Sequence, residues 1–158
     1  MWTCGKCGQR FVNKNQSHSC GKFSVERFLE GKSGYAIGLF RYFLTEYRKI
    51  GPFDLHPVKT RIALVSQMRF CAVNKIGLDH IDIHLVLTEQ YSSDCFRKTD
   101  NLGNRFFVHH LRIHSKSDVT SEVRKYMRLA YRVGNRQHLV SRRRGTALCR
   151  KGRGATNA

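Results

Sequence analysis

Acidic residues are scarce in this chain. Its 158 residues include 11 Asp or Glu against 29 Lys or Arg, which gives a formal net charge of +18 at pH 7. Metal-dependent nucleases usually gather two or more carboxylates around their cations. Here only Asp79 and Asp82 lie close together, and no Glu-x-Lys pair follows them. The sequence also lacks a Gly-rich phosphate loop and a Gly-x-Ser-x-Gly motif. It therefore favours a protein that is not an enzyme.

Long apolar runs are absent as well. No run approaches the roughly 18 residues that a membrane-spanning helix needs, so no span is expected. The apolar share of 41% is enough for a core, and the length suits one ordinary domain plus a small accessory unit. The positive excess favours a polyanionic partner, because solubility alone needs far less charge of one sign. Nucleic acid is the partner that such a charge most often indicates.

Three thiols and one imidazole lie within the first twenty residues, at Cys4, Cys7, His18 and Cys20. Below roughly 40 residues a fold usually needs a metal, disulfides or a partner. A Cys-x-x-Cys turn presents two sulfurs to one ion, and the glycine after each of these cysteines suits such a turn. His18 and Cys20 are two apart and would diverge on a helix, so they belong to a loop. The pattern predicts a structural zinc site in a hairpin of zinc-ribbon or knuckle type, with Trp2 and Phe11 beside the metal.

A disulfide or a redox-active Cys-x-x-Cys pair is the alternative interpretation. A redox motif would need a strand–helix–strand context, which the sequence does not provide. Disulfides would need an oxidising compartment, and no signal peptide precedes the cysteines. The other three cysteines, Cys71, Cys95 and Cys149, lie far apart, as expected in a reducing cytoplasm. Zinc is therefore favoured, with iron left open as the bound metal.

After the metal segment, the spacing of apolar residues predicts a helix, a sheet and a helix. A helical period predicts helices at 25–30, 35–49 and 119–133, the last capped by Ser117 or Asp118 and ended by Gly134. Alternation predicts strands at 53–58, 60–65, 68–73, 81–88 and 106–114, whereas the polar stretch 91–105 predicts a long loop. Short connections predict a mainly antiparallel sheet of about five strands packed against two or three helices, which is an α+β fold.

Histidines gather on two of the predicted strands. His84 shares a face with Asp82, and His110 shares a face with Arg112. If these strands are neighbours, His84, His110 and Arg112 form an exposed cationic patch suited to phosphate contact or acid–base chemistry. The plainer interpretation, which we favour, places these histidines on the solvent face of a half-buried sheet. His109 alternates onto the apolar face and is predicted to be a hydrogen-bonded core residue.

Further basic residues extend this surface. Lys59, Arg61 and Arg69 lie on or beside the second and third predicted strands, where they either contact phosphates or simply face solvent. From about residue 135 the pattern dissolves into a tail without acidic residues, which is predicted to be disordered. Within it, Arg142, Arg143 and Arg144 are further candidates for phosphate contact. The predicted domains are a zinc segment at 1–22, an α+β domain at 23–134 and a basic tail at 135–158.

Several of these stretches resemble a known family. Residues 2–8 and 15–23 resemble the opening of small bacterial proteins in which a zinc-binding segment precedes the uncharacterised domain of unknown function 5655 (DUF5655). Looser matches follow at 59–63, Phe70, 108–110 and 130–131, so that the resemblance covers about residues 1 to 134. Gly5 departs from the pattern, because relatives tend to have proline there. The resemblance implies a metal and a fold type, and it implies no activity.

Three functions are compatible with these observations. The preferred one is a cytoplasmic protein that binds DNA or RNA, mainly by its backbone, through the zinc segment, the basic sheet and the tail. The second is an interaction module whose basic surface recognises an acidic protein. The third is a hydrolase that uses the histidine cluster. The first is preferred because the positive charge is the strongest global signal, and the oligomeric state is left open.

Overall fold

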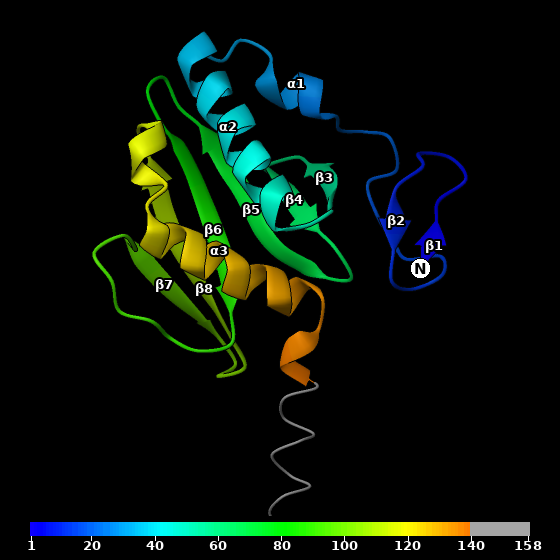
Figure 1. Ribbon diagram of the computed structural model, residues 1–158. Coiled ribbons are helices and arrows are strands. Elements are labelled where there is room, and N and C mark those ends of the chain that lie inside the picture. Colours follow the sequence, from blue (N-terminus) through cyan, green and yellow to red (C-terminus); the bar gives the residue numbers. More distant parts are fainter. Residues whose placement is uncertain (140–158) are drawn as a thin grey trace, which may run out of the picture.

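A computed structural model describes residues 1–139 of the chain. Arg142, Arg143 and Arg144, like nearly all of the predicted disordered tail, lie outside the described residues. The helices are α1 (Val25–Leu29), α2 (Gly34–Ile50), the short 3-10 helix η1 (Lys116–Asp118) and α3 (Ser121–Gly134). The strands are β1 (Trp2–Thr3), β2 (Arg10–Phe11), β3 (Asp54–Val58), β4 (Arg61–Val65), β5 (Arg69–Ile76), β6 (Ile81–Leu87), β7 (Lys98–Leu102) and β8 (Phe106–Ile113). This arrangement is the predicted α+β fold (Figure 1).

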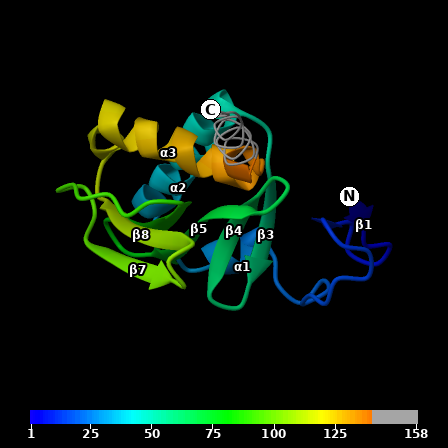
Figure 2. The same cartoon turned by 90° about the horizontal axis from the view of Figure 1, so that it is seen from below.

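Six of the strands form one antiparallel sheet in the order β3-β4-β5-β6-β8-β7. Strands joined by short connections pair in sequence, and only β7 and β8 exchange places at the edge. Helices α2 and α3 lie on one side of this sheet (Figure 2), and no helix of residues 1–139 covers the middle of the other side. We call that other side the open face. None of the helices in the described part of the chain is long and apolar enough to cross a membrane.

The core lies between the sheet and the two long helices. Buried apolar side chains of β4, β5, β6 and β8 meet the buried stripes of α2 and α3. Tyr47 of α2 is fully buried, and its hydroxyl donates to the carbonyl oxygen of Met127 in α3 at 3.2 Å. Its ring also lies 5.3 Å from that of Phe70, measured between centroids. The apolar face predicted for the long helix therefore packs against the sheet.

The predicted helix boundaries hold except at the last helix. Side-chain oxygens of Ser24 and Ser33 accept from the backbone N–H three residues on, as an N-cap does. The last helix was expected to be capped by Ser117 or Asp118, and this prediction was wrong. Asp118 instead accepts from the backbone N–H of His114 at 2.8 Å and ends η1. Helix α3 begins two residues later, where Thr120 caps it by accepting from Val123.

Strand β7 lies in a stretch that was predicted to be a loop, and this prediction was wrong. The strand carries Lys, Thr, Asp and Asn, which are not an alternating apolar pattern. It is the edge of the sheet, so β8 alone supplies its pairing. The turn into β8 has positive φ at Gly103 (+64°) and Asn104 (+56°). This Gly-Asn pair beside an apolar strand was the signal of a hairpin.

Candidate metal centre and basic sheet face

The first eleven residues form a small hairpin that presents two cysteines on one turn. Strands β1 and β2 pair Trp2 with Phe11, and the turn is closed by a hydrogen bond from Cys4 N–H to the Gln9 carbonyl oxygen at 2.9 Å. The N–H of Gly8 in turn donates to the Cys4 carbonyl oxygen at 2.9 Å. Gly8 has a φ of +72°, which glycine adopts without steric cost. The turn therefore needs glycine at position 8.

The four predicted ligands converge on one point. One donor atom each from Cys4, Cys7, His18 and Cys20 lies within 4.8 Å of the others. The Cys4 and Cys20 sulfurs are 3.7 Å apart, and the Cys7 sulfur is 3.3 Å from Nε2 of His18. With metal–sulfur bonds of about 2.3 Å, a tetrahedral site needs donor separations of about 3.5 to 3.8 Å. A disulfide bond of about 2.05 Å is far shorter than the Cys4–Cys20 separation. The group can therefore hold a metal ion.

His18 is oriented for ligation by its second ring nitrogen. Its Nδ1 lies 2.7 Å from the Gln16 carbonyl oxygen, and because a carbonyl only accepts, Nδ1 carries the hydrogen. Nε2 is then free to bind a metal, which is the usual outer-shell arrangement of a ligating histidine. The ring of Phe11 lies 4.4 Å from that of His18, and the ring of Trp2 lies 6.2 Å from it. The two aromatics flank the ligand set, as predicted.

The three thiols have different electrostatic surroundings. The pKa of Cys4 is lowered to about 6, chiefly because the backbone N–H groups of Lys6 and Cys7 donate to its sulfur. The pKa of Cys20 is raised to about 11, chiefly by burial and then by its contact with Cys4. Three thiolates this close together repel one another unless a cation lies between them. A divalent ion at the centre would supply that charge and hold all three deprotonated.

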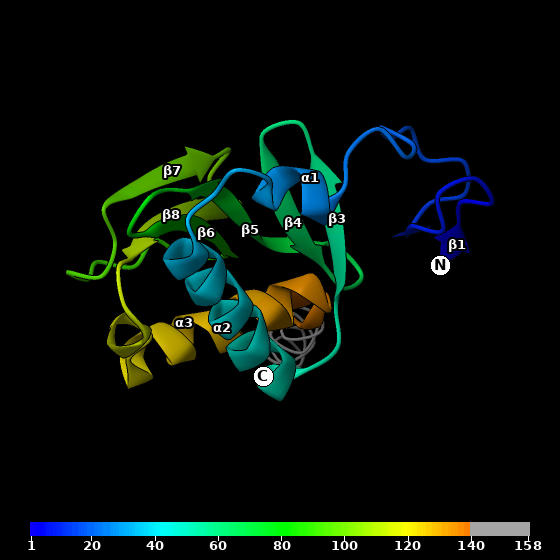
Figure 3. The same ribbon diagram turned by 90° about the horizontal axis from the view of Figure 1, so that it is seen from above.

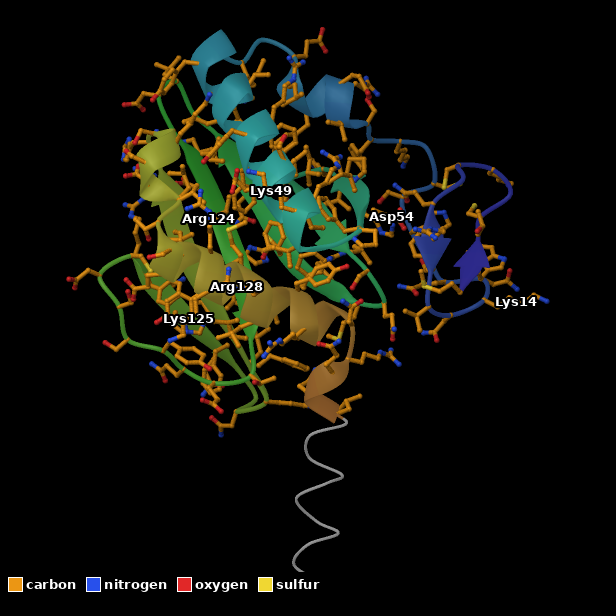
Figure 4. The ribbon with its side chains drawn as sticks, viewed as in Figure 1. Lys14, Lys49, Asp54, Arg124, Lys125 and Arg128 are labelled. Atoms are coloured by element: carbon orange, nitrogen blue, oxygen red, sulfur yellow. The ribbon has the colours of Figure 1, made fainter. Side chains whose placement is uncertain are left out.

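The hairpin lies beside the edge of the sheet formed by β3 (Figure 3), and side chains connect the two. Arg10 donates to both carboxylate oxygens of Asp54, at 2.8 and 3.0 Å. Figure 4 shows Asp54 on the side of β3 that faces the hairpin. Two residues further along β3, the ring of His56 lies 5.1 Å from that of Phe11, measured between centroids. His56 is 7% exposed, and this burial lowers its pKa. The contact therefore has an exposed ion pair and a buried pair of rings tilted at 51° to each other.

Strand pairing places one continuous row of side chains across the open face. The register joins residues of all six strands in the order His56, Ala63, Ala72, His84, His110 and Lys98. His84 and His110 are therefore direct cross-strand neighbours, with ring centroids 5.6 Å apart. Asp82 and Arg112 form the next pair along β6 and β8. The expected alignment of the two histidine strands is thus observed.

The exposed cationic patch that was the less favoured interpretation of these histidines is not observed, and His84 does not lie at the solvent surface as the favoured interpretation placed it. Arg112 donates to both oxygens of Asp82, at 2.6 and 3.0 Å, and His110 Nε2 lies 2.8 Å from a carboxylate oxygen of Asp100. His84 is only 5% exposed, and its Nδ1 lies 3.0 Å from Oδ1 of Asn74. Burial, followed by the nearby positive charges, lowers the pKa of His84 to about 4. This part of the face is therefore balanced by Asp82, which was predicted to share the face with His84, and by Asp100, which lies in the stretch that was predicted to be a loop.

Arg61 and Arg69 are two cations of the open face. Neither forms an ion pair with any residue of 1–139, and both lower the pKa of His84, so both lie near it. The pKa of Arg69 is itself lowered, first by burial and then by Arg61. The pairing of β4 with β5 shifts at this point, where Val65 pairs with Arg69 instead of the next residue. This bulge turns Arg69 to the open face. Lys59 is exposed in the turn between β3 and β4.

Comparison with known protein families identifies the larger domain. A family model described as a domain of unknown function (DUF5655) matches residues 26–134. The chain belongs to the DUF5655 family. The match begins inside α1 and runs to the end of α3, so it contains the whole six-stranded sheet and leaves the N-terminal hairpin outside. No curated protein and no solved structure matches the chain. Function must therefore be argued from the residues themselves.

A cleft of about 500 Å³ separates the hairpin from the DUF5655 domain. Its walls are residues 9–13 and 16–19 on the hairpin side, and residues 56–58 and 65–69 on the sheet side. Arg10, Arg69 and Arg136 all line it. Arg69 thus borders both the cleft and the open face, which makes the two surfaces continuous. The sequence showed no sign of this cleft, because its walls come from distant segments.

Three further histidines lie within the DUF5655 domain. His109 is fully buried and its Nε2 accepts from the Tyr91 backbone N–H at 3.0 Å. Its Nδ1 lies 3.2 Å from the Phe107 carbonyl oxygen, so the predicted hydrogen-bonded core histidine is confirmed. His80 and His114, which the sequence analysis did not single out, lie together with Asp79 at one end of the sheet.

Proposed function

We propose that this protein binds the backbone of nucleic acid across the open face and the adjoining cleft, and that zinc holds the hairpin wall of that cleft in shape. The observation that carries the proposal is the pair Arg61 and Arg69. Both face outward on neighbouring strands, and neither has a carboxylate partner among residues 1–139. Unpaired guanidinium groups beside one another repel, and a phosphate between them relieves that repulsion.

The distribution of acids supports the same assignment. Elsewhere on the face, Arg112 and Lys98 are paired with Asp82 and Asp100. Charge is therefore left unbalanced on β4 and β5, where Arg61, Arg69 and the exposed Lys75 form no ion pair with a described residue. The bulge in β5 that turns Arg69 outward belongs to a class of irregularity that often re-aims a side chain beside a binding site. Contacts of this kind give affinity and little sequence preference, because phosphates are the same in every sequence.

Zinc is the metal that we propose for Cys4, Cys7, His18 and Cys20. Three thiolates and one imidazole form a common structural zinc set, and soft sulfur donors favour zinc over hard cations. With four protein donors the coordination sphere is full, so the ion serves structure. Of the predicted nucleic-acid contacts, Arg69 lines the cleft beside the hairpin, Arg61 lies on the adjoining open face, and Lys59 is exposed in the turn between β3 and β4. His84 and Arg112 are expected to support this surface and not to touch phosphate.

The test is a titration of labelled single-stranded DNA, duplex DNA and RNA with the full chain at several salt concentrations. We expect the logarithm of affinity to fall steeply with the logarithm of salt. The double variant Arg61→Ala/Arg69→Ala should weaken binding by about tenfold or more and reduce the salt slope by about 2, since each lost phosphate contact removes roughly one unit. Absence of binding at low salt would reject the proposal.

The matched control removes the same charge from the other side of the molecule. Arg128 and Arg132 are exposed on α3, and neither forms an ion pair with a described residue. Figure 4 shows Arg128 on the helix side of the sheet. The variant Arg128→Ala/Arg132→Ala should bind as the natural chain does. If both double variants lose affinity equally, net charge alone drives binding and the open face is not the site.

A further inference from the structure

Three residues at one end of the sheet form a compact donor cluster outside the thiolate centre. Pairing of Ile81 with Ile113 brings His80 and His114, the residues just beyond, opposite each other, with ring centroids 5.5 Å apart. Asp79 lies between them. One of its oxygens is 2.7 Å from Nδ1 of His80, and the other is 3.9 Å from Nδ1 of His114. One donor atom from each of the three lies within 4.8 Å of the others.

The backbone around the cluster is held in place. The N–H of Gly77 donates to the His80 carbonyl oxygen at 2.8 Å, and the ring of His80 lies so close to Gly77 that a Cβ there would be 2.5 Å from Cε1. His80 is consequently only 14% exposed. On the other strand, the His114 N–H donates to Asp118, and the Tyr35 hydroxyl donates to the His114 carbonyl oxygen. The backbone on both sides of the cluster therefore holds His80 and His114 in position without a bound ion.

The second nitrogen of His80 gives an independent reason to place a cation here. Nε2 is buried and has no hydrogen-bond partner, and the charged group beside it is the Asp82 carboxylate at 3.9 Å. When Nδ1 donates to Asp79, the lone pair of Nε2 faces this carboxylate, which is an unfavourable pairing of two acceptors. A metal ion on Nδ1 moves the hydrogen to Nε2, where it points at Asp82. That is the carboxylate–histidine–metal arrangement common among ligating histidines, and Arg112 already holds the carboxylate in position.

We propose that Asp79, His80 and His114 bind one divalent cation of the Zn²⁺, Co²⁺ or Ni²⁺ type through two imidazole nitrogens and one carboxylate oxygen. Imidazole donors select these ions over Mg²⁺ and Ca²⁺, which prefer oxygen alone. Three protein ligands leave at least one coordination position open, in contrast to the filled thiolate centre. Strand alternation puts His80 and His114 on the open face, so the free position points toward the surface that carries Arg61. The proposal stands whether or not that surface binds nucleic acid.

The test uses the full chain, purified without a polyhistidine tag and with its thiolate centre filled by zinc. Titration with Co²⁺ should add one further equivalent, measured by equilibrium dialysis and metal analysis. The added ion should give weak visible absorption without the strong near-ultraviolet charge-transfer band of cobalt–thiolate bonds. Resonances near the ends of β6 and β8 should broaden in the NMR spectrum. Lack of a further equivalent, or appearance of the thiolate band on that equivalent, would overturn the proposal.

Two variants locate the ion. His114→Ala should weaken binding of the added Co²⁺ by at least about tenfold, the usual effect of losing a ligand or its support. His114 is exposed at 56%, so its removal leaves the core intact. His110→Gln, a change of the neighbouring histidine on the same face of β8, should leave Co²⁺ binding unchanged. Equal losses in the two variants, or none in His114→Ala, would place the ion elsewhere.

Discussion

His84 and His110 face each other across β6 and β8, yet only His110 has an acidic partner. His110 Nε2 lies 2.8 Å from Asp100, whereas His84 Nδ1 lies 3.0 Å from the neutral side chain of Asn74. Asn74 is available because the pairing of β5 with β6 shifts between Val73 and Lys75. Two equivalent ladder positions therefore hold histidines of different character. The buried one, with its pKa lowered to about 4, is neutral at pH 7.

Neutral His84 makes stability depend on pH. Its pKa rises from about 4 in the folded chain to about 6.5 in the unfolded chain, so acid favours the unfolded state, which binds the extra proton. The stabilisation is complete above pH 6.5 and is lost as pH falls from 6.5 to about 4, with an upper bound of about 3 kcal/mol. Denaturant unfolding should therefore show that the free energy of unfolding depends less on pH across this window in His84→Gln than in the natural chain. The glutamine can still hydrogen-bond to Asn74. Parallel curves for the two chains would contradict the assignment.

Removal of the metal should unfold the hairpin and spare the sheet. None of the core residues between the sheet and the long helices comes from the first 22 residues, so the DUF5655 domain does not depend on the hairpin for burial. Metal binding by such sites contributes on the order of 10 kcal/mol to folding the segment that holds them. Chelation, or Cys7→Ser, should abolish hydrogen-exchange protection of the Cys4 and Gly8 amides. Protection in β4 to β6 should persist.

The control for this experiment is Cys95→Ser. Cys95 is a half-buried thiol that lies outside the ligand group. The natural chain and this variant should each retain one equivalent of zinc at the hairpin, measured by elemental analysis, whereas Cys7→Ser should lose it. Loss of protection throughout the sheet on chelation would show that the hairpin and the domain fold as one unit, against this prediction.

Two glycines in the metal-binding turn should respond differently to the same change. Gly8 has a φ of +72°, where a Cβ costs roughly 1 kcal/mol, so Gly8→Ala should weaken zinc binding about fivefold. Gly5 has no positive φ, and a Cβ built on it meets no atom within 4 Å, so Gly5→Ala should bind zinc normally. Competition with a chromogenic chelator measures both. A larger loss in Gly5→Ala would mean that the turn geometry described here is wrong.

The four candidate metal ligands and the helices could be predicted from the sequence, because each pattern depends on residues that lie close together in the chain. Cys4 and Cys7 are joined by one turn, and the apolar stripe of α2 repeats within one helix. The strand that carries Arg69 could be predicted, but the side of the sheet that Arg69 faces could not, because a bulge opposite Val65 decides it. Strand β7 was not predicted because its own side chains are mostly polar and do not alternate, and because it is held in the sheet by pairing with β8. The Asp79, His80 and His114 cluster depends on the register of β6 with β8, which sequence spacing does not encode.

The attachment of the hairpin to β3 gives the last prediction. Arg10 is 52% exposed, so its ion pair with Asp54 is screened by water and salt and contributes little. The rings of Phe11 and His56, tilted at 51° to each other, are both buried, and an aromatic pair adds about 0.5 to 1.5 kcal/mol beyond its burial. His56→Ala should therefore free the hairpin to tumble separately in ¹⁵N relaxation measurements, whereas Asp54→Ala should have a small effect. His56→Phe keeps a ring and removes the unpartnered Nε2, so it should hold the hairpin at least as firmly as the natural chain. Greater freedom in Asp54→Ala than in His56→Ala would assign the attachment to charge instead of ring packing.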